Sequence, residues 1–304
     1  MRVAFLLNPA ARSGRAARVA PELQRAAREL GVDGAVHLTA RPRHAERLAR
    51  ELAPGVDVVV AVGGDGTVSE VVAGLAGGPV PLGIVPLGTG NDLAATLGVP
   101  RGVREAVARV VRPDAELRRI DLLDVAWTDR GGAAGERVVA NAVGVGFDAA
   151  AAAGAARYKR LGGTAAYIAS VLRTLGGWSR PTRTARVWAD GALVHDGPLF
   201  LCEIGNGPRV GGGFVLTPGA RLDDGVADVC LVGHVATGRA LRLLPRAIRG
   251  THVAAPEVAV ARAREVRVEA AGDAVPVHGD GESLSAGVAE LTARVRPGAL
   301  AVRG

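Results

Sequence analysis

The segment from Asp57 to Leu75, DVVVAVGGDGTVSEVVAGL, constrains the fold more than any other part of the sequence. An apolar run typical of a buried strand is followed by the loop Gly63–Thr67 and then by a helical pattern. Glycines let the backbone adopt positive φ and approach a ligand closely, and the amides at a helix start attract phosphate. The segment predicts a strand, a phosphate-binding loop and a helix, because a plain turn needs one glycine rather than three around an acid.

Asp65, inside this loop, would repel a phosphate directly. Its expected roles are therefore to hold magnesium through water or to fix the loop. A second loop, Pro86–Asp92 (PLGTGND), joins a strand ending at Val85 to another helix. Ligands of open α/β sheets bind at the carboxyl ends of strands, so both loops should lie side by side and face one crevice.

A third loop, Asn8–Gly14 (NPAARSG), follows the first strand and offers Arg12 and Ser13 as phosphate donors. A Walker A loop requires Gly-Lys, and the only lysine, Lys159, follows a tyrosine. The Rossmann pattern G-x-G-x-x-G is absent after the first strand, which argues against a redox role for NAD. Nucleotide chemistry here must rely on backbone amides, arginine and Mg²⁺.

The first 125 or so residues alternate apolar runs with helical periodicity, which predicts a doubly wound α/β domain. The expected strands are Arg2–Leu7, Gly34–Thr39, Val58–Val62 and Pro81–Val85, and the expected helices lie near Arg15–Leu30, His44–Leu52, Thr67–Leu75 and Asn91–Leu97.

After about Trp127 the pattern changes to short strands separated by Gly, Pro and Asp turns, which predicts a mainly antiparallel second domain. Its expected strands are Arg137–Val143, Thr184–Trp188, Leu199–Ile204, Ala227–Val232 and Val266–Ala270, with helices near Thr164–Leu175 and Gly238–Arg249.

The net charge of +7 comes almost wholly from arginine and suits an anionic partner. Only 3% of the residues are aromatic, which argues against nucleic-acid modules that stack bases. No apolar run is long enough to cross a bilayer and no signal peptide is visible, so a cytoplasmic location is expected. The two cysteines, Cys202 and Cys230, have no metal-ligand spacing and are interpreted as buried thiols.

The chain resembles the diacylglycerol kinase catalytic family in its small bacterial lipid-kinase form. The resemblance extends over nearly the whole chain and rests on these segments: NPAARSG (8–14), GGDGT (63–67), PLGTGND (86–92), RRIDLLDV (118–125), NAVGVGFDA (141–149), LDDGVADVCLV (222–232) and GDGE (279–282).

The resemblance implies an α/β nucleotide domain similar to phosphofructokinase and NAD kinase at residues 1–126. A β-sandwich lipid-substrate domain at 127–284 would follow, with the active site in the cleft between the domains and the tail from about residue 285 returning to the first. It also implies Mg·ATP as phosphate donor, a lipid hydroxyl as acceptor with diacylglycerol as the first expectation, and peripheral association with the inner face of the membrane. A homodimer stays open.

The family's functional residues carry over as follows. Its ATP contacts fall on Asn8, Pro9, Arg12, Ser13, Gly14, Thr39, Gly63, Gly64, Asp65, Gly66, Thr67, Val68, Ser69, Gly88, Thr89 and Asn91. Its magnesium site falls on Asp224 with Arg221 and Val226, and Asp65, Asp92 and Asp121 would bridge through water to the nucleotide. Glu282 would accept the proton of the lipid hydroxyl. Ser69 stands where the family commonly has Asn.

One segment suggests how such an enzyme could reach lipid. Arg239, Arg242, Arg246 and Arg249 have helical spacing and form one stripe, while Leu241, Leu244 and Ile248 should fall roughly opposite. The stripe is expected to meet anionic head groups. An ordinary helix with packed leucines and solvated arginines is an equal alternative.

Other functions stay open at this point. Relatives with the same loops phosphorylate phosphatidylglycerol or sphingoid bases, and the nucleotide motifs do not decide among acceptors. An NAD kinase-like enzyme shares GGDG, but its Asn-Glu pair is absent from the sequence. A catalytically silent lipid-binding protein would not need all of the carboxylates named above.

Overall fold

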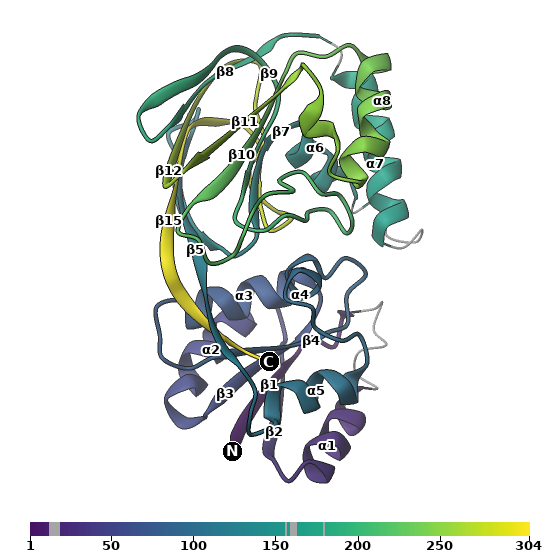
Figure 1. Ribbon diagram of the computed structural model, residues 1–304, viewed down its shortest axis with the longest axis vertical. Coiled ribbons are helices and arrows are strands. Elements are labelled where there is room, and N and C mark those ends of the chain that lie inside the picture. Colours follow the sequence, from purple (N-terminus) through teal and green to yellow (C-terminus); the bar gives the residue numbers. More distant parts are fainter. Residues whose placement is uncertain (12–18, 156, 159–162, 179) are drawn as a thin grey trace. The chain divides into compact units, whose positions relative to one another are not determined.

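The computed structural model describes residues 1–11, 19–155, 157–158, 163–178 and 180–304, which form two compact units (Figure 1). Unit 1 consists of Met1–Asp121 with Gly298–Gly304, and unit 2 of Leu122–Pro297. The boundary expected after residue 126 therefore falls at Asp121, and the returning tail begins at Gly298 rather than near residue 285. The strands β5 (Leu117–Asp129) and β15 (Val288–Arg303) run through these boundaries unbroken, so no turn signal marks them.

Unit 1 is built on a parallel sheet with the strand order β15-β4-β3-β1-β2. Every residue of β3 is buried, as its unbroken apolar sequence predicts for a strand covered on both faces. The other elements of this unit are β1 (Arg2–Leu7), α1 (Ala20–Glu29), β2 (Asp33–Leu38), α2 (His44–Leu52), the 3₁₀ turn η2 (Ala53–Gly55), α3 (Asp65–Leu75), β4 (Leu82–Pro86), α4 (Asp92–Thr96) and α5 (Val103–Val111); β3 is Val58–Gly63.

Helices cover both faces of this sheet. α1 buries Leu23, Ala26 and Ala27, a spacing that places them on one stripe, and packs with α5 against alternate residues of β1 and β3. α2 and α3 pack together on the opposite face. The doubly wound layout predicted from the sequence is confirmed.

Unit 2 is a sandwich of two mainly antiparallel sheets that share the long strand β9 (Ala192–Gly205). The first half of β9 pairs with β8 in one sheet, and its second half pairs with β7 and β10 in the other. The first sheet also holds β6 (Ala134–Val139), β8 (Arg183–Ala189), β12 (Glu265–Gly272) and parts of β5 and β15; the second holds β7 (Ala142–Gly146), β10 (Ala227–Gly233), β11 (Val258–Ala263), β13 (Val277–Gly279) and β14 (Glu282–Ser285). An aliphatic core of Val, Leu, Ile and Ala fills the space between the sheets.

The helices α6 (Phe147–Ala155), α7 (Gly163–Gly177) and α8 (Thr237–Ile248) pack in a second apolar cluster together with residues of the second sheet. A short 3₁₀ turn, η4 (His252–Ala254), follows α8. Several of the protein's few aromatic side chains gather in this cluster: Phe147 stacks on Phe200 with ring centroids 4.4 Å apart and meets Trp178 edge-on. Within the part of the chain that the structure describes, no helix is long and apolar enough to cross a bilayer.

The single strand predicted at Arg137–Val143 is wrong, because β6 ends at Val139 and β7 begins at Ala142. The carboxylate of Asp280 accepts the backbone N–H groups of Ala140, Asn141 and Ala142 at 2.8 to 3.2 Å. These amides cannot serve a continuous strand ladder, so the chain turns from one sheet into the other here. Cys202 and Cys230 are buried free thiols, as predicted, and burial raises the pKa of Cys230 to about 12.

Candidate active site

Three loops follow the carboxyl ends of the adjacent strands β1, β3 and β4 in unit 1. Parallel pairing brings these ends to one edge of the sheet, because Leu7 is in register with Val62 and Gly63 with Pro86. The prediction that the two glycine loops lie side by side is confirmed.

Glycine residues allow the two loops to approach each other closely. A Cβ added to Gly88 would lie 2.6 Å from the Cα of Gly64, so the two backbones touch where neither residue has a side chain. The N–H of Leu87 donates to the carbonyl of Gly63 at 2.7 Å. A Cβ on Gly63 would lie 2.4 Å from Thr67 Oγ1, so that glycine also allows α3 to begin.

Asp65 links the loops through both oxygens. Its Oδ2 accepts the N–H of Asn91 and its Oδ1 accepts the N–H of Asp92, each at 2.7 Å. Asn91 has φ of 58° and holds Gly88 through two further bonds, from Gly88 N to its Oδ1 and from its Nδ2 to Gly88 O. Of the two roles left open for Asp65, fixing the loop is the one that these bonds perform.

The first loop joins the same group. Asn8 donates through Nδ2 to Thr67 Oγ1 at 3.2 Å and accepts the N–H of Ala10. Pro9, which follows it, is half-buried, and Thr39 lies just beyond β2 with its N–H bound to the carbonyl of Leu7. Arg12, Ser13 and Gly14 lie outside the described residues.

The remaining expected ATP contacts differ in accessibility. Thr67, Val68 and Ser69 are buried in the first turns of α3, so their side chains are turned into unit 1. Gly66 is half-buried and Thr89 is exposed. A nucleotide at this edge of the sheet would therefore meet mainly the backbone of the GGDGT loop, together with Asn8 and Thr89.

Of the two other carboxylates assigned to a bridging network, Asp92 lies at the start of α4 and meets Asp65 through the backbone bond described above. Asp121 is buried and its Oδ1 accepts the N–H of Gly298 at 2.7 Å. That bond ties the returning tail to β5, so Asp121 has a structural contact within unit 1.

The expected magnesium residues lie on a turn before β10 in unit 2. Asp224 accepts the N–H of Val226 and forms an ion pair with Arg262, and Arg221 is exposed beside Asp223. Burial, together with the charge of Asp224, raises the pKa of Asp228 although Arg262 opposes the shift. Two carboxylates that repel one another suit a hard cation, and Arg262 supplies positive charge there.

Glu282 begins β14, directly after the turn that closes the β13–β14 hairpin. Its Oε2 accepts Arg137 Nη2 at 2.8 Å, and its side chain is 40% exposed while that of Arg137 is 13% exposed. The turn is fixed by Asp280, whose bonds to residues 140–142 were described above. The ion pair with Arg137 and the turn fix where this carboxylate lies.

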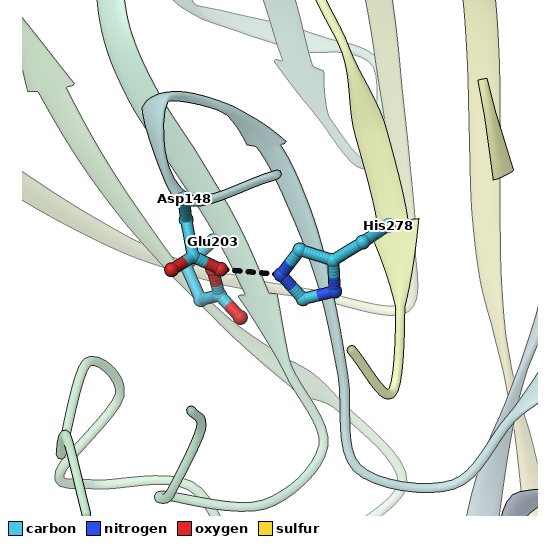
Figure 2. A group of neighbouring side chains, drawn as sticks. All are labelled: Asp148, Glu203 and His278. Carbon is cyan, nitrogen blue, oxygen red and sulfur yellow. Dashed lines mark hydrogen bonds and ion pairs between the residues drawn. The ribbon is translucent and has the colours of Figure 1, made fainter. Parts of the chain in front are cut away.

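One cluster was not predicted. Asp148, Glu203 and His278 of unit 2 are buried, and one ligand-type atom from each lies within 4.8 Å of the others (Figure 2). Burial raises the pKa of Asp148, but its interactions with His278 and with the hydroxyl of Tyr167 outweigh burial, so that pKa lies below its ordinary value. Among the described residues this is the one group of three such side chains, and it differs from the set around Asp224.

The sequence patterns of two known domains match this chain. The diacylglycerol kinase catalytic domain matches residues 2–125, and the YegS C-terminal NAD kinase beta sandwich-like domain matches residues 141–304. A diacylglycerol kinase of Mycobacterium tuberculosis is 34% identical over 294 residues, which cover 96% of this chain and 92% of that protein. The chain belongs to the diacylglycerol kinase family of lipid kinases.

Other members and neighbours agree with this assignment. A protein named "Probable lipid kinase YegS-like" from Chromohalobacter salexigens is 36% identical over 76% of this chain and 73% of its own length. A diacylglycerol kinase structure from Bacillus anthracis has a TM-score of 0.77 at 23% identity, covering 99% of this chain and 96% of that one. An NAD kinase from Archaeoglobus fulgidus, solved with ATP, has a TM-score of 0.54 at 15% identity, covering 100% and 94%. This lipid kinase therefore shares the NAD kinase fold.

Proposed function

We propose that this lipid kinase transfers the γ-phosphate of Mg·ATP to the hydroxyl of diacylglycerol, giving phosphatidic acid. The observation that carries the proposal is the pair of glycine loops locked together by Asp65 at the carboxyl edge of the unit 1 sheet. The diacylglycerol kinase of Mycobacterium tuberculosis supplies the choice of acceptor.

The nucleotide would bind through backbone groups. The first N–H groups of α3 have no partner inside the helix and carry partial positive charge, so they can cradle phosphate without a lysine. Because Asp65 already binds two amides of the neighbouring loop, both loops are preorganised before the nucleotide arrives.

Asp224 would hold Mg²⁺ with backbone oxygens of Arg221 and Val226, and the cation would replace part of the charge that Arg262 now supplies. When bound, the cation neutralises charge that develops on the transferring phosphoryl group.

Glu282 would act as the general base. Its carboxylate takes the proton of the lipid hydroxyl as that oxygen bonds to the γ-phosphorus, and the bond to the β,γ-bridging oxygen breaks to release ADP. Arg137 donates a hydrogen bond to Glu282 and so helps to orient its carboxylate.

We also propose that α8 meets the membrane surface, but through a set of exposed residues that differs from the one expected. The apolar face expected at Leu241, Leu244 and Ile248 is wrong in detail: the side chains packed inward are Ala240, Leu243 and Ala247, with Leu244 partly buried, while Leu241 and Ile248 are 43% and 41% exposed. Arg239 forms a two-bond ion pair with Glu257, and Arg246 binds the carbonyl of Thr251.

Two arginines of the stripe are thus available to lipid. Arg242 and Arg249 are exposed, and the structure gives them no partner among the residues it describes. Arg242 lies on α8 with the exposed Leu241 and Ile248, and Arg249 directly follows the last residue of the helix. Charge beside apolar side chains fits an anionic bilayer surface.

The first test is transfer of labelled γ-phosphate from Mg·ATP to a panel of lipids in mixed micelles. Diacylglycerol should be labelled, and Glu282→Gln should lower kcat by about 10²- to 10⁴-fold. Glu269→Gln is the matched control, since Glu269 is also a partly exposed glutamate paired with arginine in unit 2. Label on phosphatidylglycerol or a sphingoid base would replace the acceptor, and no label on any lipid would favour an NAD kinase-like enzyme or a silent binding role.

A further inference from the structure

Three segments of unit 2 that lie far apart in the sequence meet at the buried cluster of Figure 2. His278 lies on β13, Asp148 in the first turn of α6 and Glu203 on β9, and their exposed fractions are 3%, 4% and 0%. Nε2 of His278 is hydrogen-bonded to Asp148 Oδ2, and the hydroxyl of Tyr167 donates to the other oxygen of Asp148.

The other nitrogen of His278, Nδ1, faces the turn of the β13–β14 hairpin, which leads into Glu282. Nδ1 accepts the backbone N–H of Gly281 at 3.2 Å, so Nδ1 carries no proton in this arrangement. Nε2 must then carry the ring proton and donate it to Asp148. The imidazole is a bridge with one donor and one acceptor, and its lone pair faces Gly281 rather than the carboxylates.

Glycine at position 144 is required for this bridge. A Cβ there would lie 2.3 Å from His278 Nε2 and 2.6 Å from Asp148 Oδ2. Gly146, two residues on, has φ of 96°, which turns β7 toward α6 and carries Asp148 to the imidazole. The segment NAVGVGFDA (141–149) therefore leaves space for the His278 ring and places Asp148 beside it.

Gly281 directly precedes Glu282 in the two-residue turn of the β13–β14 hairpin. Asp280 has φ of 51° and Gly281 has φ of 80°, and Asp-Gly is a favoured sequence for a hairpin turn with positive φ at both positions. Asp280 is held by the three amides of residues 140–142, and Gly281 by His278. These bonds fix the backbone directly before the peptide that leads into Glu282.

We propose that His278, backed by Asp148, is a positioning residue for Glu282: it holds the N–H of Gly281 and so sets where the catalytic carboxylate points. This inference rests on the proposed role of Glu282 as the base. A small misplacement of a catalytic group costs a large factor in rate, so the bridge should affect kcat although both side chains are buried.

The test compares His278→Leu, which removes both bonds, with His278→Gln, which offers an amide donor and a carbonyl acceptor. His252→Leu is the matched control, because His252 is also a buried histidine of unit 2, bonded to Leu216 O, away from the hairpin. His278→Leu should lower kcat for lipid phosphorylation at least tenfold with KM for ATP unchanged. His278→Gln should recover part of that loss, and His252→Leu should lower stability without lowering kcat of the folded enzyme.

A double-mutant cycle separates positioning from general damage. In a Glu282→Gln background, His278→Leu should cause no further loss of kcat, because there is no base left to position. Losses that multiply, or equal losses in the His252 variant, would overturn the proposal.

Hydrogen exchange keeps the inference testable if the lipid kinase assay fails. The amides of residues 279–282 should exchange faster in His278→Leu than in wild type or His278→Gln, and unchanged exchange would reject the bridge itself. One equivalent of a transition metal in the purified protein, lost in His278→Leu, would instead make the cluster a metal site. An inactive wild type with the expected exchange pattern would remove Glu282's role while leaving the bridge in place.

Discussion

A single carboxylate joins the two glycine loops at the carboxyl ends of the unit 1 strands. Asp65 binds two backbone amides of the neighbouring loop, a use that an acid next to a phosphate site does not suggest by itself. Its negative charge is offset by these donors, so a nucleotide phosphate can bind nearby without full repulsion.

Asp65→Asn should weaken both stability and nucleotide binding. The amide keeps one acceptor oxygen, and its NH₂ group faces an N–H that has lost its partner. Hydrogen bonds to charged groups contribute about 1.5–3 kcal/mol, so urea unfolding should show a loss on the order of 2 kcal/mol and KM for ATP should rise. Asp57→Asn is the control, since Asp57 accepts the N–H of Arg2 at the other edge of the same sheet; an equal rise in KM there would contradict the assignment.

The chemical character of single residues could be predicted from the sequence more completely than the contacts between them. The loops, their glycines and their carboxylates could be read directly, and both roles of Asp65 were stated. The His278–Asp148 bridge could not be predicted, because its partners are 130 residues apart and a single histidine carries no spacing pattern. The only available signal was that both lie in or beside segments of the family pattern.

α8 illustrates how the face of an element depends on its neighbours. Periodicity placed its arginines on one stripe, but it could not show that Glu257 and Thr251 take two of them. Periodicity also could not show which side of α8 is buried. That side contains Ala240 and Ala247, whose small side chains allow the helix to pack closely on its neighbours.

Charge reversal of Arg242 and Arg249 should reduce binding to vesicles of phosphatidylcholine with phosphatidylserine. Each arginine near an anionic surface contributes about 1 kcal/mol, so Arg242→Glu with Arg249→Glu should weaken binding at least tenfold, and added salt should shrink the difference. Arg186→Glu with Arg267→Glu, on strands of unit 2, is the control pair. Unchanged binding of the α8 variant would reject this surface.

Other elements show what periodicity can and cannot reveal. α5 carries a readable helical spacing at Ala106, Val107 and Val110 and could have been predicted. α6, with the sequence FDAAAAAGA, has no polar stripe to mark its face. The break between β6 and β7 depends on Asp280, which lies about 140 residues later in the chain.

The two units share strands but have separate cores. β15 buries Val288 in the core of unit 2, and its final residues enter unit 1, where Leu300 is fully buried and Val302 pairs with Leu82 of β4. The order of the two units could be predicted from the change of pattern near residue 126. The start of the returning tail could not, because β15 passes from unit 2 into unit 1 without a turn that would mark the boundary.

Leu300→Ala should destabilise unit 1 selectively. Removing a fully buried leucine side chain costs about 2–5 kcal/mol, so amide exchange should accelerate in β3 and β4 while β9 and β10 stay protected. Val288→Ala in the same strand should show the reverse pattern. Equal acceleration in both units by either variant would mean that they unfold as one body.

The returning tail also fixes the order in which the protein can mature. Residues 298–304 leave the ribosome after all of unit 2, yet they fill a strand position beside β4 and bind Gly77, Asp121 and Arg109 of the first-made unit. Until then the sheet keeps an uncovered edge, which is a template for pairing with other chains. A chain that has not yet reached residue 298 therefore exposes this edge, and unpaired strand edges of this kind promote aggregation and recruit chaperones.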